Sequence, residues 1–461
     1  MRQFRPPALL PLLLPIASAL AQSDPYPSTY RPDSAPPTLI RNATLLIGDG
    51  TRIDEGDLLI ENGRIARVGR DLRAPAGARI IDARGRWVTP GIIDVHSHLG
   101  VYAAPGVRAH EDGNELTNPN TANVWAEHSI WPGDPQFELA RAAGVTTLQI
   151  LPGSGNLFGG RGVTLKNVAA ITYQAMKFPG APHGLKMACG ENPKRVYGGD
   201  KKFPSTRMGN MAGWRAAWQE AVEYQREWAE YEAKRREAAA NGRNELKVPK
   251  RDLRLETLVA VLRGEILVHH HCYRADEMVQ VLDLAREFGY RVSTFHHATE
   301  AYKIADLLAR EGVCAAMWAD WWGFKMESYD AIPENVAIVD RVRDGCAIVH
   351  SDSAEGMQHL NQEAAKVIAR AAAIGWRIAP EQAIRWITSN AARALGIAAQ
   401  TGTLAPGKMA DIVIWNRNPF SSYALADQVL IDGVLVHDRS RPPQRPSSDF
   451  LLGQPVLEES P

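Results

Sequence analysis

The sequence lacks a net charge, and beyond its first 21 residues it lacks any apolar run long enough to cross a membrane. Its 52 basic residues balance its 52 acidic residues, so the composition gives no indication of a nucleic-acid partner or of an anionic membrane surface. Hydrophobic residues make up 45% of the chain and charged residues 23%, as in ordinary globular proteins. A length of 461 residues predicts two or three domains, and we expect no membrane span in the mature chain.

The N-terminus departs from this composition. Residues 1–21 begin with Arg2 and Arg5, continue with an apolar stretch interrupted by proline, and end in Ala-Leu-Ala. A basic start, an apolar middle and a small-residue end are the features of a secretory signal peptide. We therefore expect residues 1–21 to be removed and the mature protein, beginning near Gln22, to be secreted or periplasmic.

Cysteine is scarce. The four cysteines lie far apart in apparent core segments and show no paired spacing; they are Cys189, Cys272, Cys314 and Cys346. Export permits disulfides, but this pattern does not require one. We favour buried free thiols, which pack as small apolar side chains, over disulfides.

Short strand-like segments fill both ends of the mature chain. After a linker rich in Pro, Ser and Tyr at 22–36, residues 37–87 alternate such segments with Asn-Gly and Asp-Gly pairs, which are strong hairpin signals. The same texture returns in residues 401–461. We expect one small β-sandwich domain built from both ends; the alternative is two independent modules, each small for a stable core.

Between these ends, from 88 to 400, apolar strand-like runs alternate with helical patterns. This alternation predicts a parallel sheet, and a segment of this length fits a (β/α)8 TIM barrel, with a doubly wound sheet as the alternative. Residues 152–167 are rich in glycine and are expected to form a loop after the second strand. Residues 201–255 form a charged, tryptophan-bearing helical insert, which either covers the site or is a solvated helical hairpin.

Histidine gathers where the predicted barrel strands end. "VTPGIIDVHSHLG" carries His96 and His98, which are two residues apart and so point the same way from a strand. By the same alternation, we expect only one of the adjacent His296 and His297 to point inward. The other strand ends carry His269, His270 and His271 in "ILVHHHC", and His350 and Asp352 in "AIVHSDS".

Strand ends that carry histidine or aspartate in four places indicate a metal site, because barrel strands gather chemistry at their carboxyl ends. The alternative for any single pair is a set of hydrogen-bonded structural histidines. Imidazoles and carboxylates bind Zn²⁺ and similar ions, which lower the pKa of bound water and polarise a carbonyl oxygen. Asp352 is the candidate to accept the proton of that water as a general base.

Motifs spread over nearly the whole mature chain match one enzyme group when taken in order. They are "DGTRIDEGDLLIENGRIARVG", "VTPGIIDVHSHLG", "HHHCYRADEM", "FHHATEAYKIADLL", "VHSDS", "ITSNAARALGI" and "GTLAPGKMADIVIW". In this set the chain resembles the amidohydrolase superfamily, in the branch with imidazolonepropionase-like and prolidase-like members. The resemblance implies a TIM barrel with a composite β domain, and a divalent metal, with Zn²⁺ expected.

Carried over by motif, the resemblance implies ligands from strands one, five, six and eight of the barrel. They are His96, His98, His271, His297 and Asp352. Relatives with two metals bridge them with a carboxylated lysine or a glutamate, and Lys186 and Glu191 are the two candidates here. One metal with a structural lysine is the remaining alternative.

The resemblance also bears on the reaction. Deaminases of this superfamily carry a glutamate three residues after the strand-five histidine, where this chain has Arg274. We therefore expect hydrolysis of a C–N amide bond in a dipeptide, N-acyl amino acid or cyclic amide; a deaminase and a non-catalytic barrel are the alternatives. Arg195, Tyr197 and His296 are candidate substrate-binding residues, with Arg195 or Arg207 pairing with a substrate carboxylate. The sequence does not decide between a monomer and a homo-oligomer.

Overall fold

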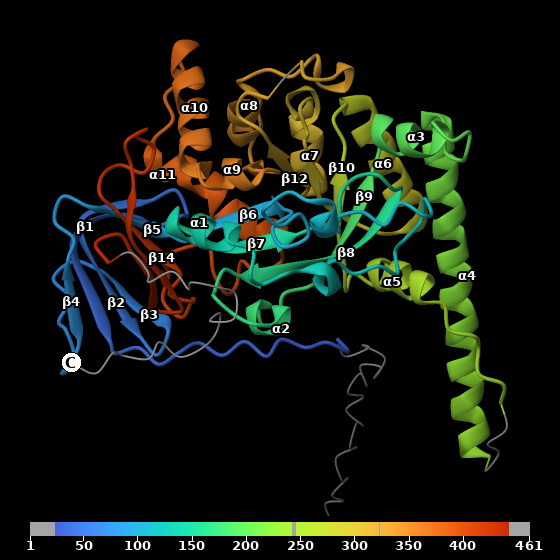
Figure 1. Cartoon of the computed structure of the whole chain (residues 1–461), viewed down its shortest axis with the longest axis horizontal. Coiled ribbons are helices and arrows are strands. Elements are labelled where there is room, and N and C mark those ends of the chain that lie inside the picture. The colour runs from blue at the N-terminus through green and yellow to red at the C-terminus, as the bar shows by residue number, and fades with distance from the viewer. Residues whose placement is uncertain (1–23, 242–245, 322, 442–461) are drawn as a thin grey trace, which may run out of the picture.

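The computed structural model describes residues 24–241, 246–321 and 323–441, which form a barrel and a β-sheet domain (Figure 1). The expected signal peptide and most of the C-terminal tail lie outside the described residues, so the signal peptide stays a prediction. Among the described residues, none of the helices is both long and apolar enough to traverse a bilayer.

The β-sheet domain is one eight-stranded sheet in the order β16-β15-β14-β5-β1-β2-β3, with β4 pairing with β1. Strands β5 and β14 pair antiparallel, so the two ends of the chain share one sheet and one apolar core, as expected. The strands are β1 (Thr38–Leu46), β2 (Arg52–Glu61), β3 (Arg64–Gly69), β4 (Arg79–Asp82), β5 (Trp87–Pro90), β14 (Ile412–Trp415), β15 (Ala426–Ile431) and β16 (Val434–Asp438).

Two of the hairpins in this sheet follow directly from the sequence. The pair Asn62-Gly63 joins β2 to β3 with φ of 51° and 72°, and Asp432-Gly433 joins β15 to β16 with φ of 48° and 76°. Two-residue hairpin turns need positive φ at both positions, which Asn, Asp and Gly tolerate best. The hairpin predictions from these dipeptides are confirmed.

The barrel is a second eight-stranded sheet, in the order β13-β12-β11-β10-β9-β8-β7-β6. The backbone N–H of Asp352, just after β13, donates to the carbonyl of His96 in β6 at 3.1 Å and so brings the two edges together. The strands are β6 (Ile92–Ser97), β7 (Val145–Ile150), β8 (Phe158–Lys166), β9 (Gly184–Ala188), β10 (Leu267–His271), β11 (Val292–His296), β12 (Cys314–Met317) and β13 (Ala347–Val349). The predicted TIM-barrel class is confirmed.

One strand of the barrel differs from the prediction. The glycine-rich stretch 152–167, expected to be a loop, contains β8, which runs antiparallel to both β7 and β9. The connection from β7 to β8 holds no helix, and so short a connection can join only antiparallel strands, because parallel neighbours need a crossover of a dozen or more residues. The sheet is therefore parallel in all its other pairs but not at β8.

Helices surround the barrel (Figure 1). They are α1 (Gln136–Ala142), α2 (Tyr173–Met176), α3 (Glu191–Gly198), α4 (Arg207–Ala240), α5 (Leu253–Leu262), α6 (Ala275–Phe288), α7 (Ala305–Glu311), α8 (Asn335–Arg341), α9 (Ala354–Met357), α10 (Leu360–Ala373), α11 (Pro380–Ala383) and α12 (Ser389–Ala394). Short 3₁₀ turns are η1 (Arg108–His110), η2 (Ala126–Ser129), η3 (Ala301–Ile304), η4 (Met326–Ser328) and η5 (Ile384–Ile387).

The helical insert packs beside the barrel and does not cover its mouth. In the first half of α4, Trp214 packs against His270, and Trp218 packs against Phe158 and Tyr290. The second half of α4 extends past the barrel in Figure 1, and its buried residues end at Tyr224. The idea that the insert covers the site is therefore wrong, because its aromatic residues serve packing on the outer face of the barrel.

The preference for free thiols is also wrong. Cys189 and Cys272 form a disulfide between the ends of β9 and β10, and Cys314 and Cys346 form a second between the starts of β12 and β13. Each pair lies on neighbouring parallel strands, where equivalent positions come within bonding distance whatever their separation in sequence. A spacing argument along the chain could not detect such pairs.

Candidate active site

The sequence-predicted ligands of strands one and eight meet at one carboxylate. His96 lies near the end of β6 and His98 directly follows it, and their Nε2 atoms lie 3.3 and 3.2 Å from Oδ1 of Asp352. His297 presents its Nε2 at 3.6 Å from the other carboxylate oxygen of Asp352. Three imidazoles thus converge on one acid at the carboxyl ends of the strands, where barrel enzymes place their chemistry.

Left-handed backbone at two of these residues makes the convergence possible. His297 has φ of 57° and Asp352 has φ of 56°, a conformation that costs energy for residues other than glycine and often marks functional sites. At His297 this turn breaks the alternation of β11, so that the rings of both His296 and His297 face the ring of His96. The expectation that only one of the two histidines points inward is therefore wrong.

The electrostatics of the site keep His96 and His297 neutral. Burial, and then the charge of nearby Lys186, hold the pKa of His96 well below its usual value. Burial also holds the pKa of His297 well below its usual value. His98 has Nδ1 2.8 Å from the carbonyl of Leu151, so Nδ1 donates to that carbonyl. Neutral imidazole is the form of histidine that binds metal.

Asp352 is the anion of the site. Burial by itself would raise the pKa of its carboxyl, but the hydrogen bond from His98 and the charges of His98, His350 and Lys186 bring the pKa below its usual value. The side chain is only part-buried, with 25% of its surface exposed. A carboxylate that stays ionised near neutral pH and reaches solvent can both bind a cation and accept a proton.

Lys186, one of the two candidate bridging residues, lies inside this cluster. Lys186 is in the middle of β9, and its Nζ is 3.1 Å from Nε2 of His96. Burial lowers the pKa of this ammonium group to about 7, so a large share of the amine is neutral at physiological pH. Glu191, the other candidate, begins α3, and its carboxylate lies 3.5 Å from Nζ of Lys325.

His271, the predicted strand-five ligand, borders the cluster through His297, with ring centroids 4.8 Å apart. Its Nε2 lies 3.4 Å from Nδ2 of Asn192 in α3. His350 was not predicted as a ligand, yet it offers a ring nitrogen within 4.8 Å of ligand atoms of His96 and His297. Neither ring nitrogen of His350 has a hydrogen-bond partner among the described residues. The signal for His350 was its place two residues before Asp352, on the same face of the strand.

The other predicted substrate-binding residues lie in different surroundings. Arg195 is on the exposed side of α3, and Tyr197 is buried with its hydroxyl donating to the carbonyl of Asn118 at 2.8 Å. The guanidinium of Arg207 pairs with the carboxylates of Glu277 and Glu327. His296 is fully buried below His96. The role of Arg195 stays a prediction.

A row of aromatic side chains, which the sequence analysis missed, leads from the cluster toward solvent. Trp318 stacks on His297 with ring centroids 4.4 Å apart, and Trp321 stacks on Trp318 at 4.9 Å. Trp321 is 41% exposed and Phe324 is 55% exposed, which is unusual for such large apolar groups. The signal in the sequence was the aromatic run "WADWWGFK" directly after the seventh strand of the barrel.

Lys325 ends this row and places a cation beside the cluster. Its Nζ lies 4.0 Å from the centre of the Tyr273 ring and 3.3 Å from Oδ1 of Asn192, the same amide that approaches His271. Burial is the main effect on its pKa, which lies below the usual value for lysine. The aromatic row and Lys325 together offer an apolar surface and a positive charge next to the metal-ligand candidates.

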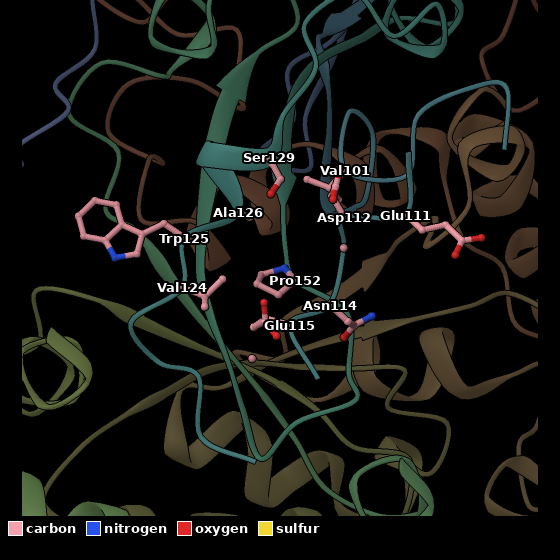
Figure 2. Close-up of a pocket in the computed structure, with 12 residues that line it drawn as sticks. Val101, Glu111, Asp112, Asn114, Glu115, Val124, Trp125, Ala126, Ser129 and Pro152 are labelled. Carbon is pink, nitrogen blue, oxygen red and sulfur yellow. The ribbon is translucent and has the colours of Figure 1, made fainter. Parts of the chain in front are cut away.

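A cavity of about 150 Å³ is lined by the segments that follow β6 and β7 and by residues around η2 (Figure 2). Its walls include Glu115, Asn114, Pro152 and Gly159, and Figure 2 shows Pro152 and Glu115 facing each other across its centre. A Cβ at Gly159 would stand 3.6 Å from Cγ of Lys186, so the Lys186 side chain packs directly behind the cavity wall at this point.

Tyr102 separates this cavity from His98. Its ring lies 5.6 Å from the ring of His98, and its hydroxyl accepts a hydrogen bond of 2.5 Å from the amide of Asn114, which lines the cavity. The cavity therefore adjoins the metal-ligand candidates through a single layer of side chains.

Comparisons with known proteins agree with this geometry. The model of the amidohydrolase family matches residues 333–436. The crystal structure of an amidohydrolase from Thermotoga maritima covers 87% of this chain and 100% of that chain, with 33% identity and a TM-score of 0.77. The chain belongs to the amidohydrolase family.

Two curated amidohydrolase relatives cover most of the chain. The amidohydrolase tasK of Hapsidospora irregularis is 31% identical in an alignment 470 residues long that covers 94% of this chain and 47% of that protein. The chain thus spans about half the length of this relative. The imidazolonepropionase of a Bradyrhizobium strain is 26% identical over 400 residues, covering 79% of this chain and 88% of that protein.

Amidohydrolases typically bind a divalent metal, and the residues of this chain fit one. Imidazoles and a carboxylate, the donors that Zn²⁺ prefers, converge within 4.8 Å in His96, His98 and Asp352. Both ring nitrogens of buried His350 are unpartnered among the described residues, although buried polar atoms are normally paired. The donor chemistry and the orphaned nitrogens both suit a cation held at this place.

Proposed function

We propose that this protein is a metal-dependent hydrolase that cleaves a C–N amide bond. The observation that carries the proposal is the convergence of His96, His98 and His297 on the carboxylate of Asp352 at the mouth of the barrel. For one or two metal ions, His96, His98, His271, His297 and Asp352 are the proposed ligands, and Lys186 is favoured over Glu191 as the bridge because Lys186 contacts His96. Zn²⁺ is the proposed ion, since the donors are mostly imidazoles.

The bound metal would supply an acidified water and an electrophile for the amide carbonyl. Asp352 accepts the proton of the attacking water and delivers it to the nitrogen of the leaving amine. Its depressed pKa keeps it ionised for the first step, and its exposed fraction gives it access to the substrate. His98 orients Asp352 through the contact at 3.2 Å and is itself held by the carbonyl of Leu151.

The proposed substrate carries a carboxylate and an apolar group, as in a dipeptide or an N-acyl amino acid. Lys325 supports the carboxylate, because its cation stands beside Asn192 and His271 at the cluster. Trp318 and Trp321 support the apolar group, since they extend from His297 toward solvent as a stacked surface. The sequence offered Arg195 or Arg207 as the carboxylate partner. Lys325 is preferred here because it lies beside the cluster, whereas Arg207 pairs with Glu277 and Glu327.

Hydrolysis is favoured over deamination by the surroundings of β10. Arg274, which replaces the glutamate of deaminases, pairs with Asp276 at 2.9 Å in an exposed position. The next acid, Glu277, pairs with Arg207. Neither acid contacts the histidine cluster, so the proton transfer to a ring nitrogen that a deaminase needs has no carboxylate from this segment.

The test is hydrolysis of a panel of dipeptides, N-acyl amino acids and cyclic amides by the Zn²⁺-loaded protein, with metal content measured in parallel. Asp352→Asn should reduce kcat by about 10²- to 10⁴-fold, the range of a lost general base. The matched control Asp330→Asn removes an exposed acid that pairs with Lys303 and should leave kcat unchanged. Full activity of Asp352→Asn, or a wild-type chain that holds no divalent metal, would refute the proposal.

We propose in addition that the protein is exported. The basic and apolar pattern of residues 1–21 and the two disulfides support this, since disulfides persist in oxidising compartments. Expression of the full chain in a bacterial host should yield periplasmic protein whose N-terminal sequence begins near Gln22. Uncleaved protein confined to the cytoplasm would contradict the export proposal without affecting the proposed reaction.

A further inference from the structure

Beneath the metal-ligand candidates, three histidines and a glutamine form a continuous chain of hydrogen-bonding atoms. Nδ1 of His96 lies 2.9 Å from Nδ1 of His296, and Nε2 of His296 lies 2.9 Å from Nδ1 of His269. Nε2 of His269 lies 3.3 Å from the side-chain amide of Gln149. The chain runs from β6 through β11 and β10 to β7, and at most 1% of each residue is exposed.

The barrel is built to hold this chain in place. His269 pairs in register with Thr294, two residues before His296, so it lies one layer deeper in the barrel than His296. Gly184 in β9 leaves the necessary space, because a Cβ there would stand 2.8 Å from Nε2 of Gln149 and 2.8 Å from Cδ2 of His269. Any other residue at position 184 would push against both members of the chain.

Each ring in the chain carries a single N–H. Both rings are fully buried, and among the described residues their nitrogens contact only other ring nitrogens and the amide of Gln149. Neither ring therefore has a carboxylate to balance a positive charge, and a buried unpaired charge is costly, so both rings are neutral. A neutral imidazole donates through one nitrogen and accepts through the other. Consecutive bonds between neutral rings must therefore all run in the same direction, and the chain has only two arrangements.

In the first arrangement the amide N–H of Gln149 donates to His269, which donates to His296, which donates to Nδ1 of His96. The single proton of His96 is then on Nε2, which blocks that nitrogen as a metal ligand. The side-chain amide of Gln149 is oriented for this first arrangement. Its nitrogen lies toward His269, and its Oε1 has no partner among the described residues.

In the second arrangement His96 donates from Nδ1 and leaves the lone pair of Nε2 free for a cation. His296 then donates to His269, and Nε2–H of His269 needs an acceptor. Gln149 provides one if its amide turns over, so that Oε1 takes the place of the nitrogen. The side-chain amide serves either direction by turning over, whereas each ring must move its single proton from one nitrogen to the other.

We propose that Gln149, His269 and His296 are positioning residues that set the tautomer of His96 and so its capacity to bind metal, and that the amide of Gln149 turns over when metal binds. The proposal depends on His96 being a metal ligand and does not depend on the substrate. Partners of ligating histidines commonly change metal affinity by about 10- to 100-fold when removed. Here we expect a change of metal affinity when Gln149 is replaced, although the rings of His269 and His296 separate Gln149 from His96.

The test measures Zn²⁺ affinity by competition with a chelator, in variants of the full chain. Gln149→Met has a similar shape but no acceptor, and it should weaken Zn²⁺ binding by about 10- to 100-fold. Gln149→Glu restores an acceptor oxygen and should bind Zn²⁺ nearly as tightly as the wild type. The matched control is Thr147→Val, on the same face of β7, which removes a buried hydroxyl that has no partner among the described residues.

A second readout uses the wild-type chain and so does not depend on the folding of any variant. The ¹⁵N chemical shifts of labelled histidine rings distinguish N–H from bare nitrogen, and Zn²⁺ should move the proton of His296 from Nδ1 to Nε2 and that of His269 likewise. Unchanged tautomers on Zn²⁺ loading, or equal Zn²⁺ affinities for Gln149→Met and Thr147→Val, would overturn the proposed role of the hydrogen-bonded chain. Either result would leave the proposed hydrolase intact. A wild-type chain that binds no Zn²⁺ would instead refute the ligand assignment on which both depend.

Discussion

At the scale of single residues, the molecule concentrates neutral histidines in its interior. His270 shows the free-energy cost of burying an imidazole most clearly, because it lies away from the metal-ligand candidates. It is on the outer face of β10 and packs against Trp214 and Phe295. Burial lowers its pKa to about 3. Its ring nitrogens have no partners among the described residues, so only apolar packing holds it.

The stability of the protein should therefore fall in acid, and His270→Phe should reduce that fall. A histidine whose folded pKa lies below its unfolded value of about 6.5 binds its proton more readily in the unfolded chain, so stability is lost as pH falls below about 6.5, by about 1.4 kcal/mol per pH unit for each such group. His270→Phe should gain about 1 kcal/mol more at pH 5.5 than at pH 7.5, measured by urea unfolding. The control His359→Phe, at an exposed position, should show no such difference.

Lys325 is the residue on which the proposed specificity depends. Lys325→Met should raise KM about 10- to 100-fold for substrates with a free carboxylate, because a hydrogen bond to a charged group contributes about 1.5–3 kcal/mol. Amidated analogues of the same substrates should be unaffected. The control Lys303→Met removes an exposed lysine paired with Asp330. Equal losses for carboxylated and amidated substrates would exclude Lys325 as the carboxylate partner.

At the scale of elements, the barrel is held by covalent links between neighbouring strands at both of its ends. The disulfide of Cys189 and Cys272 follows β9 and β10 directly, next to His271, and spans 83 residues of sequence. The disulfide of Cys314 and Cys346 joins the opposite ends of β12 and β13 and spans 32 residues. The first link encloses α3, α4 and α5, and with them the helical insert.

Removing either disulfide should lower the free energy of unfolding by about 2–5 kcal/mol, because a cross-link restricts the unfolded chain. The double variants Cys189→Ala with Cys272→Ala, and Cys314→Ala with Cys346→Ala, can be compared by urea unfolding. Thiol titration of the unreduced, denatured wild type should find no free thiol among these four cysteines. Four reactive thiols in exported protein would contradict both links.

At the scale of the whole molecule, one buried lysine joins the barrel to the β-sheet domain. Lys166 ends β8, and its Nζ lies 2.8 Å from Asp411 and 2.8 Å from Asp432, which belong to the C-terminal part of the sheet domain. Tyr30, from the segment before β1, donates to Asp432 at 2.7 Å. Both ends of the described chain and the barrel therefore meet at one ammonium group.

Lys166→Met should lower the free energy of unfolding by about 3–5 kcal/mol, since it leaves two carboxylates buried without their cation. Lys303→Met, which breaks an exposed pair, should cost less than about 1 kcal/mol. Chemical unfolding monitored by tryptophan fluorescence would measure both. A small loss for Lys166→Met would mean that the joint between the barrel and the sheet domain does not depend on this charge.

Features that depend only on residues close together in the chain could be predicted from the sequence. The dipeptides Asn62-Gly63 and Asp432-Gly433 predicted their hairpins, because positive φ is a property of the residue itself. The alternation of strands and helices predicted the barrel, and the histidines at the strand ends predicted where the candidate ligands meet.

The tertiary structure alone decided which distant residues become neighbours. It paired the cysteines, reversed the direction of β8, and brought Lys325 and His350 to the cluster. At His297 it imposed a left-handed backbone that local preference opposes, and so turned two adjacent histidines to one side. Contacts of this kind depend on strand order and on packing across the barrel, and strain at a single residue is offset by the rest of the fold. Local patterns, such as the spacing of His350 and Asp352, could therefore mark candidate residues but not decide which of them meet.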